Sequence, residues 1–132
     1  KKIRCCENID YFYVRENEGS LSTTFPHNLY EQIDLLFRFD VEMLQKIGCQ
    51  ETDIDNLKKI YSYKMLTNVP KAVNTSFRDY KSFVKKISKN KIIKSHLNSI
   101  EDKRFFMIGK LIFLRAYLPL YIICRLMMKK NK

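Results

Sequence analysis

Two acidic pairs are the positions at which this chain could carry out metal or proton-transfer chemistry. Asp53 and Asp55 form an Asp-x-Asp pattern, whose carboxylates could hold Mg²⁺ or Mn²⁺. Glu101 and Asp102 are adjacent, and such a pair could supply a general base. Both pairs stand at the predicted beginnings of helices, where the helix dipole favours acidic side chains. We therefore interpret them as helix-start residues and expect no metal site in this chain.

The histidines and cysteines offer no stronger site. His27 and His96 stand apart from other potential ligands in the sequence, so we expect ordinary surface or packing roles for them. No Cys-x-x-C pair is present, which is typical neither of a zinc site nor of a disulfide framework. We expect reduced thiols in a cytosolic protein. The four cysteines are Cys5, Cys6, Cys49 and Cys124.

The segment Ile9–Phe25 carries the most informative pattern of the chain. An aromatic stretch, Tyr11–Arg15, is followed by the turn sequence Asn17–Ser20 and a Ser/Thr-rich exit. This order resembles the end of the catalytic domain in bacterial family 2 glycosyltransferases of the GT-A type. In that family, an aromatic strand of the form Tyr-x-Tyr-x-Arg runs into a turn with Gly-Ser or Asn-Ser. Residues 26–132 resemble these enzymes only in length, helix content and a basic apolar ending.

The resemblance implies that the chain is the C-terminal portion of such an enzyme. Residues 1–25 would end the catalytic domain as strand and turn, and residues 26–132 would form a helical C-terminal region. Arg15 would lie near the donor pyrophosphate, where an arginine makes two charge-assisted hydrogen bonds. Ser20 would bind a phosphate or acceptor oxygen. The alternative is a strand-end arginine and a turn serine. The parent enzyme would use Mg²⁺ or Mn²⁺, held by residues outside this chain.

The positive charge of the chain is concentrated in its last third. Residues 1–80 hold 11 Lys/Arg against 12 Asp/Glu, whereas residues 81–132 hold 14 against two. A basic end on a neutral body predicts an anionic partner for that end. An anionic membrane surface and a nucleic acid are the two candidates.

Helical periodicity dominates the chain after residue 26. Apolar residues recur with a helical period over 29–47, and Gly48 is a suitable stop. A second helix is expected to begin at Thr52 and to end before Pro70. A third begins at Ser76 and continues to about residue 88. Residues 89–99 are expected to be a loop or a short helical turn. The predicted fold is mainly α, with a short residual strand near residues 8–15.

The last predicted element is a basic amphipathic helix over residues 103–130. Its charged residues interrupt the apolar sequence too often for a membrane span. We expect one side to enter the membrane interface, through residues such as Phe105, Ile112 and Leu120, and Pro119 to kink the helix. The competing interpretation is that this side packs on the Phe77–Ile87 stripe as core. The cations predicted to meet lipid headgroups are Lys103, Arg104, Lys110, Arg115, Arg125 and Lys129.

Together these features predict the C-terminal fragment of a bacterial inverting glycosyltransferase. Its parent would transfer a sugar from a nucleotide-diphosphate donor to a glycan or lipid-linked acceptor, at the cytoplasmic face of the cell membrane. The fragment would pack on the missing catalytic domain and contact the membrane, without catalysing on its own. One alternative is a nucleic-acid-binding module that uses the basic run Lys81–Lys94. The other is a membrane-surface adaptor without an enzymatic parent. We favour the membrane over nucleic acid because a large apolar surface follows the charges.

Overall fold

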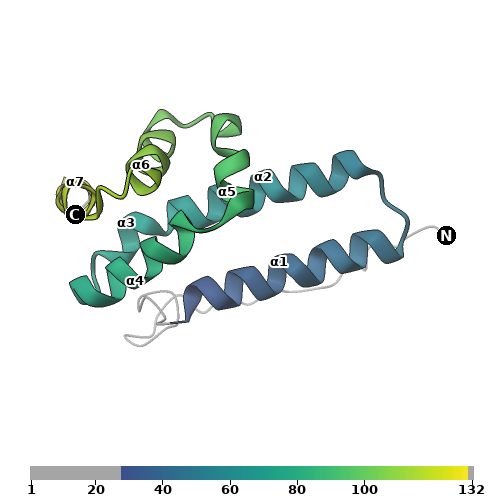
Figure 1. Cartoon of the computed structure of the whole chain (residues 1–132), viewed down its shortest axis with the longest axis horizontal. Helices are drawn as coiled ribbons and strands as arrows, with labels where there is room; N and C mark the ends of the chain where they lie inside the picture. Colours follow the sequence, from purple (N-terminus) through teal and green to yellow (C-terminus); the bar gives the residue numbers. More distant parts are fainter. Residues whose placement is uncertain (1–27, 131–132) are drawn as a thin grey trace, which may run out of the picture.

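The computed structural model describes residues 28–130, and every regular element in that range is helical (Figure 1). This confirms the mainly α fold class. The strand expected near residues 8–15 lies outside the described residues. In chain order the elements are α1 (Leu29–Lys46), α2 (Glu51–Thr67), α3 (Val69–Ala72), α4 (Phe77–Ser88), α5 (Lys91–Ser95), the 3₁₀ turn η1 (Leu97–Ser99), α6 (Lys103–Phe113) and α7 (Tyr117–Lys130).

Helices α1 and α2 form an antiparallel hairpin along one side of the molecule (Figure 1). The predicted stop at Gly48 is confirmed: its φ of 73° lies in the left-handed region that glycine adopts at low cost. The N–H of Gly48 bonds to Gln45, and that of Cys49 bonds to Leu44, at 3.2 and 3.0 Å. These two bonds satisfy carbonyls at the end of α1 in the pattern of a Schellman motif.

The starts of α2 and α4 are fixed by side-chain caps. Ser76 accepts a 3.1 Å hydrogen bond from the N–H of Asp79, which confirms the predicted start of α4. The prediction of Thr52 as the cap of α2 is wrong. Gln50 is the N-cap, and its N–H bonds to the Asp53 carboxylate at 3.2 Å in a capping box. The cap thus lies two residues earlier than predicted, because Asp53 reaches back to Gln50.

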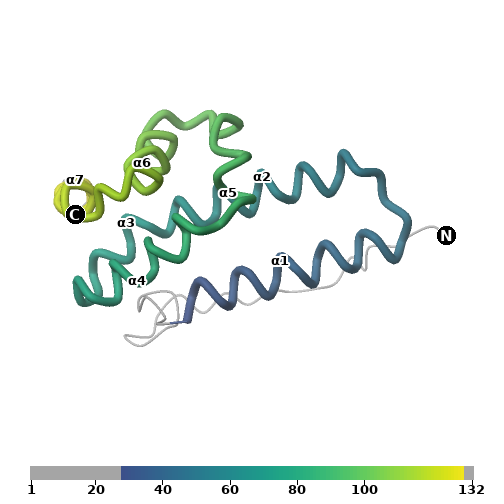
Figure 2. The backbone as a smooth tube through the Cα atoms, viewed as in Figure 1, coloured from purple at the N-terminus to yellow at the C-terminus, as the bar shows by residue number. Residues whose placement is uncertain are grey.

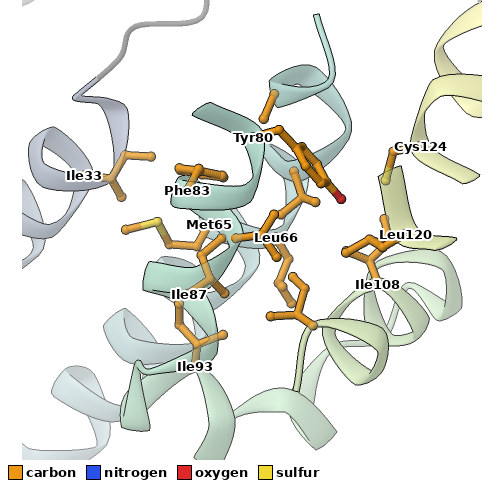
Figure 3. Packing of buried hydrophobic residues seen from close by; sticks show 14 of the residues in the cluster. Ile33, Met65, Leu66, Tyr80, Phe83, Ile87, Ile93, Ile108, Leu120 and Cys124 are labelled. Atoms are coloured by element: carbon orange, nitrogen blue, oxygen red, sulfur yellow. The ribbon is translucent and has the colours of Figure 1, made fainter. Parts of the chain in front are cut away.

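The core lies where α2, α3 and α4 meet the terminal helices (Figure 3). Figure 3 shows Leu66 of α2, Tyr80 of α4 and Leu120 of α7 pointing into one cluster. Ile93 of α5 and Ile108 of α6 complete its lower part and are also buried. Burial of apolar surface from five helices holds these short elements together, since helices of one to three turns are marginal alone.

A polar cluster fastens α5 to the hairpin. The hydroxyl of Tyr61 donates to Asp34 of α1 at 2.8 Å, and the amide of Asn90 donates to Tyr61 and Tyr30, both at 2.9 Å. The carbonyl oxygen of Asn90 accepts from the first N–H groups of α5. Every polar group of this buried seam therefore has a partner, which low-polarity surroundings require.

The predicted single helix over residues 103–130 is two helices, α6 and α7 (Figure 2). The break is at Arg115, whose φ is 59°, and not at Pro119. Arg115 bonds to Ile112, and Ala116 bonds to Leu111, so α6 ends in the same motif as α1. Pro119 is the third residue of α7, where no helical partner exists for an N–H, so the proline fits without a kink.

Candidate functional site

The face of α6 and α7 that was expected to enter lipid is mostly core. Ile108, Ile112 and Leu120 are buried, and Phe105 is half-buried against Tyr63 with ring centroids 5.5 Å apart. Both helices pack on α4, as the competing interpretation required. The membrane prediction for this face is therefore corrected: burying these side chains within the protein already removes them from water.

The outer face of α7 carries a different apolar stripe. Leu118, Ile122 and Leu126 recur every four residues and are 58%, 51% and 57% exposed. Ile123, also exposed, lies beside them on the far edge from the cations. We call these four residues the α7 stripe. At helical spacing Leu118 and Ile122 fall among the charges, whereas Ile123 and Leu126 fall on the apolar side, so the exposed stripe joins parts of both faces.

Cationic side chains border the α7 stripe on one edge. Arg125 and Lys129 are exposed; at about 100° per residue, Arg125 falls just beyond Leu118, and Lys129 falls between Leu118 and Ile122 at the C-terminal end of the helix. Arg115 is exposed just before α7 begins. Among residues 28–130, these three side chains form no ion pair. An apolar stripe with cations along one edge is the arrangement of interfacial helices.

The cations predicted on α6 are also exposed, but two of them have local partners. Arg104 lies 2.8 Å from the carboxylate of Asp102, which lowers the pKa of that carboxyl through hydrogen bonds from the Arg104 side chain and backbone. Lys110 sits 4.5 Å from the centroid of the Phe106 ring. Within the described part of the chain, Lys103 has neither kind of partner. Of the six predicted cations, Arg115, Arg125 and Lys129 therefore lie at or beside α7 and are exposed without an ion-pair partner among residues 28–130.

Within residues 28–130, no helix combines the length and apolarity needed to cross a bilayer. This agrees with the decision from sequence against a membrane span.

The Asp-x-Asp pair is structural in the part of the chain described. Asp53 closes the capping box of α2, while Asp55 accepts a 2.8 Å hydrogen bond from Nε2 of His96 and pairs with Lys59 at 2.9 Å. These bonds, first from His96 and then from Lys59, lower the pKa of Asp55 to about 2. No group of three metal-ligating side chains occurs among residues 28–130. His96 thus has a packing role that fastens α5 to α2, whereas His27 lies outside the described range.

Asp102 is the N-cap of α6, accepting from the N–H of Arg104 at 2.9 Å, which supports the helix-start interpretation of this acidic pair. A shallow pocket of about 390 Å³ lies beside it between α2 and the loop before α6. Ile60, Tyr63 and Ile100 give this pocket a largely apolar wall, and Lys59 and Glu101 stand on its rim. Nothing in this arrangement supplies a nucleophile with an adjacent base.

The described cysteines are free thiols. Cys124 lies on the buried face of α7, and burial raises the pKa of its thiol to about 11, which disfavours the reactive thiolate. Cys49 is half-buried at the end of α1. Cys5 and Cys6, and the predicted substrate-binding residues Arg15 and Ser20, lie outside the described residues.

Comparisons with family models, characterised proteins and solved structures found no match to this chain.

Proposed function

We propose that residues 28–130 form a helical module that holds its parent protein at an anionic membrane surface. The observation that supports the proposal is the α7 stripe with Arg125 and Lys129 along its edge. The helix would lie in the plane of the interface, with Ile122 and Leu126 in the acyl boundary and the cations among the headgroups. The membrane-facing side is thus the outer face of α7, which keeps Ile123 and Leu126 of the apolar side first expected but not the buried Ile112 and Leu120.

Two contributions favour this association. Each basic residue near an anionic surface adds about 1 kcal/mol, and Arg115, Arg125 and Lys129 are all exposed at or beside α7. Burial of the half-exposed Leu118, Ile122 and Leu126 side chains adds a hydrophobic term of roughly 25 cal/mol per Å². Neither contribution alone gives firm binding, because a single weak anchor is reversible. We therefore expect binding that needs both anionic lipid and the apolar stripe.

Vesicle co-sedimentation tests the proposal. The 132-residue chain should bind phosphatidylglycerol vesicles strongly and phosphatidylcholine vesicles weakly, and added salt should weaken the binding as exposed charges are screened. Ile122→Gln combined with Leu118→Gln should reduce binding at least tenfold. Leu35→Gln on α1, an equally exposed leucine away from α7, is the matched control and should leave binding unchanged. Equal binding to both vesicle types would contradict the proposal.

A parallel binding measurement with duplex DNA tests the nucleic-acid alternative. The lysines of α4 and α5 that could meet phosphates, such as Lys81 and Lys91, are exposed. If DNA rather than vesicles is bound tightly, and Ile122→Gln has no effect on it, the membrane proposal fails. We expect only weak, strongly salt-dependent DNA binding of the kind any basic protein shows.

We further propose that the parent protein is a bacterial family 2 glycosyltransferase at the cytoplasmic face of the cell membrane. The pattern of residues 9–25 supports this, with Arg15 and Ser20 near the donor. The parent's catalytic domain would hold Mg²⁺ or Mn²⁺ and transfer the sugar to a glycan or lipid-linked acceptor. In the full-length parent, Arg15→Ala should lower activity with nucleotide-sugar more than it lowers thermal stability. Equal losses would indicate a structural arginine, and turnover by this chain alone would contradict its assignment as a non-catalytic portion.

A further inference from the structure

Helix α1 exposes a second apolar stripe, which adjoins the face that packs this helix on α2. Ile33 and Phe37 are buried against α2, while Leu35, Phe39 and Ile47 are 69%, 58% and 66% exposed. No described part of the chain covers these side chains. The five exposed α1 residues, here called the α1 stripe, are Leu35, Leu36, Phe39, Met43 and Ile47.

The α1 stripe is large for a surface that faces only water. Leu36 lines a small cavity of about 80 Å³ with Ile60 of α2, and Ile60 is itself 63% exposed, so the apolar surface continues across the hairpin. Together these side chains expose on the order of 600 Å², the upper end of what single-chain proteins present. Two such surfaces in contact bury roughly 1,200 Å², the lower limit of specific protein interfaces.

The charges beside the α1 stripe, three carboxylates against the cation Lys46, disfavour an anionic bilayer as its partner. Asp40 borders one edge and Glu31 and Glu42 border the other, and all three are exposed. Inserting this stripe into a membrane would bring three carboxylates to an anionic surface, which repels them. The partner must therefore be a protein surface that is apolar and tolerates or pairs with acids.

The stripe is complementary to itself in an antiparallel arrangement. Phe39 lies midway between Leu35 and Met43, so a two-fold axis at Phe39 sets Leu35 of one copy against Met43 of the other. The same axis brings Glu31 level with Lys46 of the second copy, because residues 31 and 46 are nearly equidistant from it. Glu31 and Lys46 lie on the same edge of the helix, and equivalent edges face each other in antiparallel pairs. Their present partners, Lys86 and Glu42, form exposed pairs that exchange at little cost.

We propose that α1 is a self-association surface, at which two copies of this chain pack antiparallel through the α1 stripe. The contact is compatible with membrane binding but independent of it, because α7 packs on α3, α4 and α6 at the other end of the fold (Figure 1).

Sedimentation equilibrium of the full 132-residue chain tests the proposal. We expect a reversible monomer–dimer equilibrium with a Kd on the order of 10 μM, as suits an interface of this size. Phe39→Lys should raise that Kd at least tenfold, since it sets two like charges on the axis. Phe39 is exposed, so the variant should retain the wild-type circular dichroism and melting temperature. Ile122→Lys on α7 is the matched control and should leave the Kd unchanged.

A charge exchange tests the antiparallel alignment. Glu31→Lys alone and Lys46→Glu alone should each weaken the dimer, whereas the double variant should restore the wild-type Kd because the pair is re-formed with its charges reversed. A chain that stays monomeric up to the highest soluble concentration would overturn the proposal. If, in addition, Phe39→Lys lowers the melting temperature, residues 1–27 or another part of the same chain cover the stripe instead. If the monomeric Phe39→Lys variant loses vesicle binding, the α1 stripe contacts lipid, and the self-association proposal is wrong.

Discussion

Helices α1 and α7 present apolar stripes of similar spacing and exposure but opposite borders. Leu35, Phe39 and Met43 repeat every four residues on α1, as Leu118, Ile122 and Leu126 do on α7. The α1 stripe is bordered mainly by carboxylates, whereas cations border the α7 stripe. Hydrophobic surface is non-directional and would accept any apolar partner. The flanking charges therefore discriminate between partners: an anionic membrane suits α7, and a second copy of the chain suits α1.

The two helices also differ in how their inner faces are held. The seam between α1, α2 and α5 contains hydrogen-bonded Tyr61 and Asn90. Under α7, the hydroxyl of Tyr80 is buried without a partner in the described structure, beside the Cys124 thiol. Burial is the main reason that the pKa of Tyr80 is raised. The α1 seam thus stabilises the fold through a buried polar network, while the α7 seam relies mainly on packing, with one side-chain hydrogen bond of 3.1 Å between Ser88 of α4 and Tyr117 of α7.

Reversing the border of α7 should have the largest effect. Arg125→Glu combined with Lys129→Glu should weaken binding to phosphatidylglycerol vesicles at least a hundredfold, because each unit of charge near the surface is worth about 1 kcal/mol. Glu42→Lys on α1 is the control in co-sedimentation and should not weaken binding. If the charge-reversed variant still binds, the cations beside the α7 stripe do not determine which surface this helix contacts.

Removing the hydroxyl of Tyr61 should cost about 2 kcal/mol of unfolding free energy, measured by urea denaturation. The substitution Tyr61→Phe leaves Asp34 and Asn90 each short of one hydrogen-bond partner. Tyr80→Phe is the matched variant under α7, and it should be neutral or slightly stabilising because that hydroxyl has no partner to lose. Equal losses in the two variants would mean that the two seams do not differ as described.

Giving α1 a basic border should create a second membrane-binding helix. In the Arg125→Glu, Lys129→Glu background, Asp40→Lys with Glu42→Lys should raise affinity for phosphatidylglycerol vesicles about tenfold, through added charge beside an existing apolar stripe. The isosteric pair Asp40→Asn with Glu42→Gln should give a smaller gain. If neither variant binds better, the shape of the α7 surface matters more than its charge.

Replacing glycine in the turn that ends α1 and introducing glycine in the turn that ends α6 should change the stability of the fold in opposite directions. Gly48→Ala should lose about 1 kcal/mol of stability in thermal or urea unfolding, because φ is positive there, although an added methyl group meets nothing within 4 Å. Arg115→Gly should gain up to about 1 kcal/mol, since glycine adopts the observed φ of 59° more readily than arginine. A loss of stability in Arg115→Gly would assign a stabilising contact to the arginine side chain.

The smallest effect concerns acid stability of the contact between α2 and α5. Since the pKa of Asp55 is lowered from 3.8 to about 2 in the folded protein, its charged form stabilises the fold above pH 4. That contribution is lost as the pH falls from about 4 to about 2. Asp55→Asn should therefore melt at a lower temperature than wild type at pH 5 and differ less near pH 2. A constant difference over that range would exclude ionisation of Asp55 as the cause.

Much of the secondary structure followed from local sequence. Gly48 and the Ser76–Asp79 cap marked helix ends because they act within a few residues of one another. The break at Arg115 did not, because arginine is an unusual residue at positive φ and Pro119 offered a more conspicuous signal. The partners of His96 and Asn90 were missed for another reason: Asp55 and Tyr61 are distant in the sequence and come close only through packing.

The sequence by itself determined a helical chain with a basic C-terminal third, since periodicity, caps and charge are local properties. It also showed that Lys103–Lys130 carried two faces able to meet lipid or core. Only the tertiary structure decided between them, by burying Ile108, Ile112 and Leu120 and leaving the α7 stripe in solvent. It likewise left the α1 stripe uncovered within residues 28–130, although Leu36 and Ile47 follow the same helical period as the buried Ile33. Which side of an apolar helix is covered depends on the neighbouring elements that the fold brings together. Helical periodicity contains no information about those neighbours.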